Sequence, residues 1–169
     1  MQQRWKPAVT VAAVIEKDGR YLLVEEQRPE GLMLNNPAGH LEPNETPEQG
    51  VIRETLEESA HELTPTALVG VYLSSSIMPA EDDEAGTTTS TYLRFAYTGT
   101  VGEQIAGRAL DTGIVRALWL TLDEVRASAR RHRSSMVLRC IEDHRAGRRF
   151  PLDLVYTEPS HLSLRDDAS

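Results

Sequence analysis

Short apolar runs separated by polar turn segments dominate the chain, and this pattern predicts β-strands. The runs cover residues 8–15, 21–26, 67–74, 91–99 and 114–120. Lys17-Asp18-Gly19, between the first two runs, is a turn sequence, so we expect these two strands to form a hairpin. Three segments lack apolar periodicity and are expected to be loops: residues 28–36, 75–90 and 102–112.

The longest helix is predicted over residues 46–59. Thr46 is a good N-cap, Pro47 fits the first helical position, and Gln49 completes a capping box with Thr46. The side of this helix that is expected to face the core holds Ile52, Leu56 and Ser59.

Two further helices are predicted towards the end of the chain. Residues 121–124 form a second capping box and start a short helix. Another helix is expected from Ser134 or Ser135 to Arg145, with Gly147 placed to end it. Strands before and after one dominant helix, followed by two more helices, predict an α/β fold with a mixed β-sheet sandwiched between helices (α/β/α).

Composition and charge fit one globular domain. The 169 residues are 40% hydrophobic and 26% charged, and we expect a single domain over 1–156 with a polar C-terminal tail at 157–169. The net charge of −8 argues against a general nucleic-acid binder. Cys140 is the only cysteine, which excludes an intramolecular disulfide. The sequence shows neither a signal-peptide pattern nor an apolar span of about 18 residues, so we expect a cytoplasmic protein without a membrane partner.

Three carboxylates share one side of the helix predicted over 46–59. Glu54, Glu57 and Glu58 are spaced i, i+3 and i+4, and such like-charged neighbours repel by roughly a few tenths of a kcal/mol each. A divalent cation between them would remove that repulsion, and hard oxygen ligands of this kind suit Mg²⁺ or Mn²⁺. Arg53 precedes Glu57 by four residues and is expected to pair with it and hold its rotamer.

The segment 39–61 resembles the Nudix box. That motif reads Gly, five residues, Glu, seven residues, Arg-Glu, an apolar residue, any residue, Glu-Glu, any residue, Gly and an apolar residue. The positions that match in identity and spacing are Gly39, Glu45, Arg53, Glu54, Glu57 and Glu58. The resemblance implies the Nudix fold, an α/β/α sandwich, over most of the chain.

Three other positions depart from the motif. Thr55 and His61 stand where an apolar residue is usual, and Ala60 replaces the second Gly. That Gly normally ends the helix in the left-handed conformation, which costs Ala about 1 kcal/mol. We therefore expect the helix to end differently, running on through Glu62.

The resemblance also implies a chemistry, the hydrolysis of a phosphoanhydride with Mg²⁺ as cofactor and Mn²⁺ able to replace it. The residues that it assigns to the metal are Gly39 (through its carbonyl), Glu54, Glu57 and Glu58. Those that it assigns to catalysis are Arg53, Glu54 and Glu57. The general base stays open between Glu54 or Glu57 and an acid outside the box, either Asp111 or a member of the acidic run 81–84.

Four shorter segments resemble the NudJ-type Nudix phosphatases of bacteria. They are TVAAVIEKDGRYLLVEE, NNPAGHLEPNET, TYLRFAYTG and GRRFPLDLV. This likeness implies release of phosphate from nucleoside tri- and diphosphates and from thiamine or hydroxymethylpyrimidine pyrophosphate. Leu34 departs from it, because that group often has an aromatic residue there. The alternatives are a pyrophosphohydrolase that attacks the α-phosphorus of a nucleoside triphosphate or nucleoside diphosphate derivative, and a non-catalytic nucleotide-binding module.

Several side chains keep two interpretations. Arg94, in an apolar strand, needs an anionic partner, either a structural carboxylate or a substrate phosphate, and we assign it with Glu42 to substrate binding. Glu45 is either close to the metal or a charge favoured at the helix start. His40 is interpreted as a loop residue, and residues 130–133 as a solvated helix junction rather than a phosphate grip. The sequence leaves open whether the protein is a monomer or a homodimer that binds a small-molecule substrate.

Overall fold

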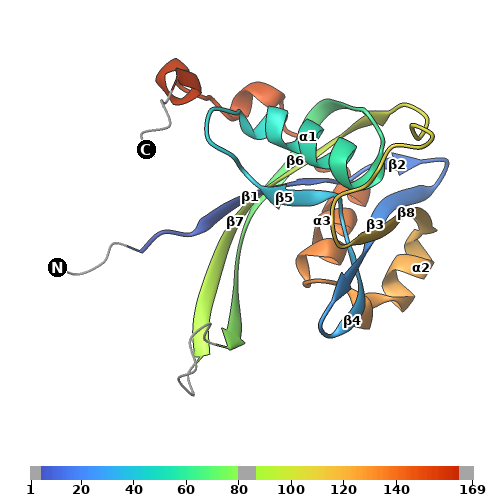
Figure 1. The fold of residues 1–169 in the computed structure, drawn as a ribbon. Helices are drawn as coiled ribbons and strands as arrows, with labels where there is room; N and C mark the ends of the chain where they lie inside the picture. The colour runs from blue at the N-terminus through green and yellow to red at the C-terminus, as the bar shows by residue number, and fades with distance from the viewer. Residues whose placement is uncertain (1–4, 80–86, 164–169) are drawn as a thin grey trace.

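The computed structural model describes residues 5–79 and 87–163 (Figure 1). A mixed sheet has the strand order β5-β1-β7-β6, in which β1 and β7 are parallel and the other neighbours antiparallel. Its strands are β1 (Ala8–Ala13), β5 (Ala38–His40), β6 (Leu63–Pro79) and β7 (Thr87–Val101). A second, antiparallel sheet contains β2 (Glu16–Lys17), β3 (Arg20–Arg28), β4 (Gly31–Asn35) and β8 (Ile114–Thr121).

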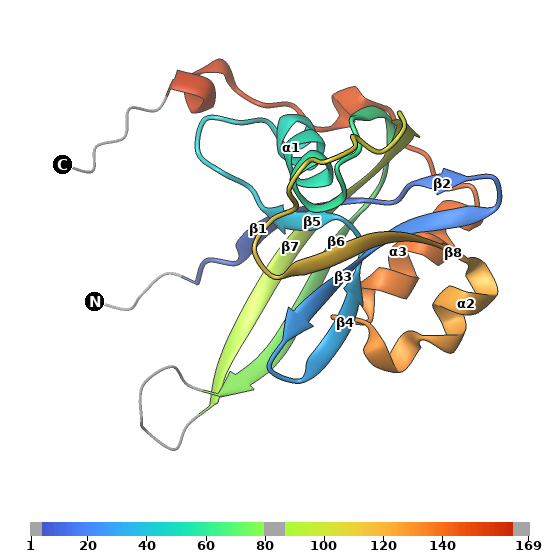
Figure 2. The ribbon, with the colours of Figure 1, turned by 45° about the vertical axis from the view of Figure 1, so that its right-hand side comes forward.

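Helices cover the sheets from two sides. Helix α1 (Pro47–Ser59) packs on β1 and β5, α3 (Met136–Arg145) packs on β6 of the mixed sheet, and α2 (Leu122–Ala127) packs on β8 of the second sheet (Figure 2). Short 3₁₀ helices cover Ala129–Arg131, Leu152–Leu154 and Pro159–Ser163. The predicted α/β class, with a mixed sheet between helical layers, is confirmed. Within residues 5–79 and 87–163, no helix is long and apolar enough to cross a membrane.

Two predicted loops are partly strands. The segment 28–36 contains β4, which pairs with β3 from Arg28↔Gly31 to Val24↔Asn35, so the expectation of a loop was wrong. Strands β6 and β7 extend into 75–79 and 87–90, where Ser75 pairs with Thr91 and their hydroxyls lie 3.0 Å apart. These segments have little apolar periodicity of their own, and each is extended because the neighbouring strand supplies hydrogen-bond partners. The acidic run 81–84 lies outside the described residues.

Helix α1 begins as predicted but presents a different side to the core. The Gln49 backbone N–H donates to the Thr46 hydroxyl at 3.0 Å, and the Thr46 N–H donates to the Gln49 side chain at 2.8 Å. Ser59 is buried as expected, but Ile52 and Leu56 are only half-buried. The fully buried residues of that side are instead Val51 and Thr55. The Thr55 hydroxyl donates to the Val51 carbonyl at 2.7 Å, which lets a polar residue occupy this position.

The end of α1 contradicts the expectation drawn from Ala60. The helix ends at Ser59, and Ala60 itself adopts the left-handed conformation with φ 57°. Its N–H donates to the Leu56 carbonyl at 3.0 Å, and its own carbonyl accepts from the Ile105 N–H at 2.8 Å. His61 follows with its Nδ1 at 2.8 Å from the Gly102 carbonyl. These contacts with the loop after β7 hold the backbone in a conformation that Ala does not favour by itself.

Candidate active site

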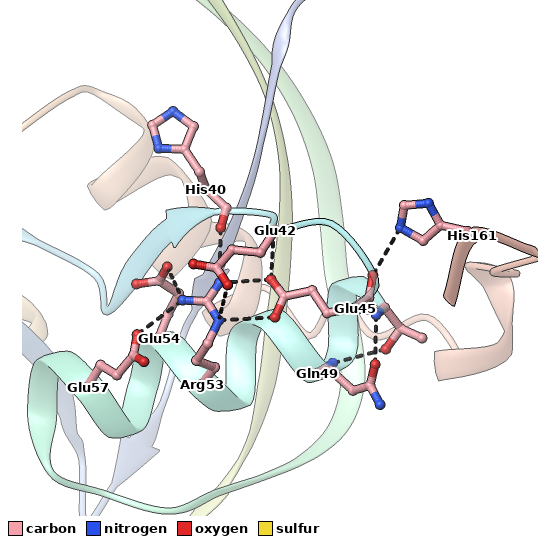
Figure 3. Close-up of polar contacts among 9 residues, drawn as sticks. His40, Glu42, Glu45, Gln49, Arg53, Glu54, Glu57 and His161 are labelled. Atoms are coloured by element: carbon pink, nitrogen blue, oxygen red, sulfur yellow. Dashed lines mark hydrogen bonds and ion pairs between the residues drawn. The ribbon is translucent and has the colours of Figure 1, made fainter. Parts of the chain in front are cut away.

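The guanidinium of Arg53 lies at the centre of a carboxylate cluster on α1 (Figure 3). Its Nη1 donates to Glu54 Oε1 at 2.8 Å and to Glu57 Oε2 at 3.1 Å, so the predicted pair with Glu57 is present. Its Nε and Nη2 donate to the two carboxylate oxygens of Glu45 at 3.0 and 2.8 Å. Nη2 also donates to the His40 carbonyl at 3.1 Å. Arg53 therefore ties α1 to the segment that leads into it.

Glu45 acts as the fixed partner of Arg53. Besides the two-point contact with the guanidinium, its Oε1 accepts from the Glu42 backbone N–H at 2.8 Å. Burial alone would raise the pKa of Glu45, but these donors together hold the pKa below its usual range. Gly50 makes room for the contact, since a Cβ there would lie 2.8 Å from Glu45 Oε1. Through Arg53, Glu45 is thus connected to two of the proposed metal ligands, Glu54 and Glu57.

Glu54 and Glu58 are held against strand β5. A Cβ on Gly39 would lie 2.0 Å from Glu54 Oε1, so the Glu54 carboxylate occupies space that only glycine leaves free. Glu58 Oε2 accepts from the Ala38 backbone N–H at 2.8 Å. Burial, reinforced by nearby carboxylates that include Glu54 and Glu26, raises the pKa of Glu58 to about 8. Burial also raises the pKa of Glu54.

Asp111 lies beside the same carboxylates. Its backbone N–H donates to the Glu57 carbonyl at 3.0 Å, which fastens the loop between β7 and β8 to the end of α1. The Asp111 carboxylate contributes to the raised pKa of both Glu54 and Glu58. Of the two candidate bases outside the box, the structure thus places Asp111 at the cluster, whereas the run 81–84 is not described.

The residue types suit Mg²⁺, although within 5–79 and 87–163 no three acidic, His or Cys side chains are gathered closely enough to hold a metal ion. Glu54 and Glu57 are turned towards Arg53, and Glu58 towards the Ala38 amide. Three carboxylates that repel one another, two of them with raised pKa values, offer the hard oxygen atoms that a small divalent cation prefers. These residues fit a divalent cation through their chemistry, and two of them meet at β5, Glu54 against Gly39 and Glu58 against Ala38.

The two residues assigned to substrate binding lie apart. Glu42 is at the cluster, with Oε2 3.9 Å from Arg53 Nε and its side chain largely exposed. Arg94 lies on β7, in register with Thr10 of β1 and Tyr72 of β6. Its positive charge partly opposes the burial that raises the pKa of the Cys140 thiol on α3. Its Nη1 is buried and has no hydrogen-bond partner within 5–79 and 87–163, so the structural carboxylate that was one alternative is not found there.

The sequence interpretation missed a second charged cluster beside the first. Glu25 and Glu26, at the end of β3, are only 3% and 6% exposed. Each lies between two arginines, and the four are Arg28, Arg116, Arg131 and Arg133. The interpretation of 130–133 as a solvated junction therefore misses the ion pairs of Arg131 and Arg133. The signal was available, because two acidic residues that end an apolar strand need basic partners if they are buried.

Comparisons with known proteins agree with this geometry. A family model described as the NUDIX domain matches residues 4–140. The phosphatase NudJ of Escherichia coli strain K12 is 29% identical over 151 residues, which cover 89% of this chain and 92% of that protein.

Solved structures show the same likeness. A NUDIX hydrolase from Nitrosomonas europaea is 47% identical, with a TM-score of 0.78 over 90% of this chain and 98% of that chain. The NUDIX domain of NrtR from Shewanella oneidensis, solved with ADP ribose, shares the fold at 19% identity and a TM-score of 0.56, covering 85% of this chain and 90% of that chain. With the box residues gathered around Arg53 and strand β5, this chain belongs to the Nudix family and is a hydrolase that acts on phosphoanhydride bonds.

Proposed function

We propose that this enzyme is a Mg²⁺-dependent phosphatase that releases phosphate from nucleoside tri- and diphosphates and from thiamine or hydroxymethylpyrimidine pyrophosphate. The observation that carries the proposal is the cluster in which Arg53 holds Glu45, Glu54 and Glu57 beside Gly39. The resemblance to the E. coli phosphatase NudJ supports release of a terminal phosphate.

In this proposal the metal is held by Glu54, Glu57, Glu58 and the Gly39 carbonyl, and Mn²⁺ can replace Mg²⁺. A bound Mg²⁺ would neutralise phosphate charge and lower the pKa of a coordinated water. Arg53 positions the carboxylates, because its Nη1 contacts both Glu54 and Glu57. The proton of the attacking water goes to Glu54, Glu57 or Asp111.

The proposed substrate is a small molecule, not a nucleic acid. Arg94, whose Nη1 has no partner among the described residues, would bind an oxygen-rich group of the substrate, and Glu42 would line the site near Arg53. The lone Cys140 is buried, which is compatible with the cytoplasm that we propose as the location. The proposal holds for a monomer and for a homodimer.

The test is a screen of nucleoside di- and triphosphates and of both pyrophosphate cofactors with Mg²⁺, with orthophosphate measured in the presence and absence of added pyrophosphatase. We expect orthophosphate without pyrophosphatase. Orthophosphate that forms from a triphosphate only when pyrophosphatase is present would mean attack at the α-phosphorus and would overturn the phosphatase proposal.

A pair of variants tests the metal assignment in the same assay. Glu57→Gln and Glu58→Gln are expected to lose at least about a hundredfold in kcat at saturating Mg²⁺, because each removes a proposed metal ligand. Glu62→Gln is the matched control, since Glu62 is exposed just beyond the end of α1. Activity that survives both box substitutions would remove Glu57 and Glu58 from the metal site.

A further inference from the structure

Four arginines surround two buried carboxylates at the end of β3. Arg116 Nε lies 2.8 Å from Glu25 Oε2, and Arg131 pairs with the other oxygen of the same carboxylate. Arg28 Nε lies 2.6 Å from Glu26 Oε2, and Arg133 Nε lies 4.0 Å from that oxygen. We call these four arginines the arginine cluster.

The arginine cluster carries more positive charge than its glutamates neutralise. Four guanidinium groups share two carboxylates, which leaves a local surplus of two positive charges in a chain whose net charge is −8. The arginine side chains are 37% to 63% exposed, so donors that do not contact the glutamates face solvent. One arginine for each glutamate would have satisfied the buried carboxylates, and the surplus indicates a further anionic partner.

The end of β3 that carries the arginine cluster is joined to the box helix through the backbone. The Gln27 N–H of β3 donates to the Gly113 carbonyl at 2.8 Å, and two residues earlier the Asp111 N–H donates to the Glu57 carbonyl at 3.0 Å. This short segment therefore fastens the end of β3 to the end of α1. Leu22 lies on the same face of β3 as Glu26 and belongs to the core cluster that contains Val51 of α1. Glu26 and its two arginines therefore lie on the face of β3 that is turned towards α1.

The backbone holds the arginine cluster in place. The Arg133 N–H donates to the Leu34 carbonyl at 2.8 Å, and Arg131 Nε donates to the Leu32 carbonyl at 3.2 Å. Leu34 is itself buried in the core, so the segment that follows α2 is anchored on β4. The guanidinium groups consequently project from a rigid base instead of a mobile loop.

We propose that the arginine cluster is a second anion site, which binds a phosphate of the substrate other than the one attacked at the box. Arg28 and Arg133, which share Glu26, make the contact. Arg116 and Arg131 pair with Glu25 on the opposite face of β3 and add only to the positive field. The site takes the phosphate two places from the one attacked, which a nucleoside triphosphate has and the matching diphosphate lacks, so the triphosphate is preferred. This inference rests on the proposed function.

The experiment compares kcat/KM for a nucleoside triphosphate and for its diphosphate in Arg133→Gln, Arg133→Lys and Arg28→Gln. Arg133→Gln is expected to lower kcat/KM for the triphosphate about tenfold, the value of one charge-assisted hydrogen bond, and to leave the diphosphate nearly unchanged. Arg133→Lys should recover part of the loss, since it keeps the charge. Arg126→Gln is the control, because Arg126 is a half-exposed arginine of α2 that pairs with Glu142 and Asp123.

Arg133→Gln is the safest of these variants for folding, because Glu26 keeps the closer Arg28. Equal losses for both substrates, or no loss for either, would overturn the inference. If the wild-type enzyme hydrolyses neither substrate, the proposed function fails instead. In that case, calorimetry with inorganic triphosphate still tests the second anion site in wild type and in Arg133→Gln. Weaker binding to the variant supports the site. Equal binding to both proteins, or no binding to either, overturns it.

Discussion

The carboxylate of Glu54 lies directly against the α-carbon of Gly39. A side chain at position 39 would meet Glu54 Oε1 at 2.0 Å and Oε2 at 2.4 Å. Neither partner can withdraw easily, because Gly39 pairs with Val11 in the mixed sheet and Glu54 is held by Arg53 at 2.8 Å. Glycine at this position therefore sets how closely the box helix approaches β5.

This contact predicts the effect of Gly39→Ala. The added methyl group must displace Glu54, and we expect kcat to fall about a hundredfold and stability to fall by about 1–3 kcal/mol. Kinetic assays and urea unfolding would measure both. Gly102→Ala is the control, because a Cβ on Gly102 meets no atom within 4 Å. Normal activity in Gly39→Ala would show that Glu54 has no fixed position in the reaction.

Replacing Arg53 by Lys tests whether the shape of the guanidinium or only its charge matters in the carboxylate cluster. A lysine keeps one positive charge but cannot bridge Glu45, Glu54 and Glu57 together, as the guanidinium does. We expect Arg53→Lys to lower kcat at least about tenfold and to destabilise the fold by about 1–3 kcal/mol. Arg126→Lys is the control, because the Arg126 side chain is half-exposed and lies outside this cluster. An Arg53→Lys enzyme with wild-type kcat would show that charge alone suffices.

Glu58→Gln should separate metal binding from folding. Glutamine keeps an oxygen that can accept from the Ala38 N–H but removes a carboxylate whose burial is unfavourable. We therefore expect Mg²⁺ affinity to fall at least about tenfold, while the metal-free protein is as stable as wild type or more so. Titration calorimetry and thermal unfolding in EDTA measure the two effects. Unchanged Mg²⁺ affinity would exclude Glu58 as a ligand.

His144 predicts how stability depends on pH. Burial, with the charge of Arg149, lowers the pKa of His144 to about 4, and its Nε2 lies 2.6 Å from Arg149 Nη2. The unfolded chain binds this proton more readily, at a pKa of about 6.5. His144 therefore contributes stability that is complete above about pH 6.5 and is lost as the pH falls towards 4, on the order of 3 kcal/mol.

Urea unfolding at a series of pH values checks this prediction. His144→Gln should flatten the change in unfolding free energy between about pH 6.5 and 4. Burial also lowers the pKa of His132, so the unfolding free energy of His144→Gln should still depend on pH, but less steeply. His40→Gln is the control, because His40 is exposed. A steep loss of stability that persists in His144→Gln would assign the effect to other groups.

The sequence alone determined the start of the box helix and the residues that cluster on it. Thr46 and Gln49 interact across three residues, and Glu54, Glu57 and Glu58 are brought together by the helical repeat. Such signals act within one or two helical turns, so they do not depend on the rest of the fold. The family membership followed from this same short stretch.

The tertiary structure decided the features that depend on distant contacts. Ala60 ends the helix because Ile105, on another loop, binds its carbonyl, so a local conformational preference is overridden. Arg131 meets Glu25 across 106 residues of sequence. That contact depends on how β3 pairs with β4 and β8. The sequence shows that both charged residues are present, but not that they are neighbours in space. The box chemistry is therefore local, whereas the arginine cluster beside it is a product of strand pairing.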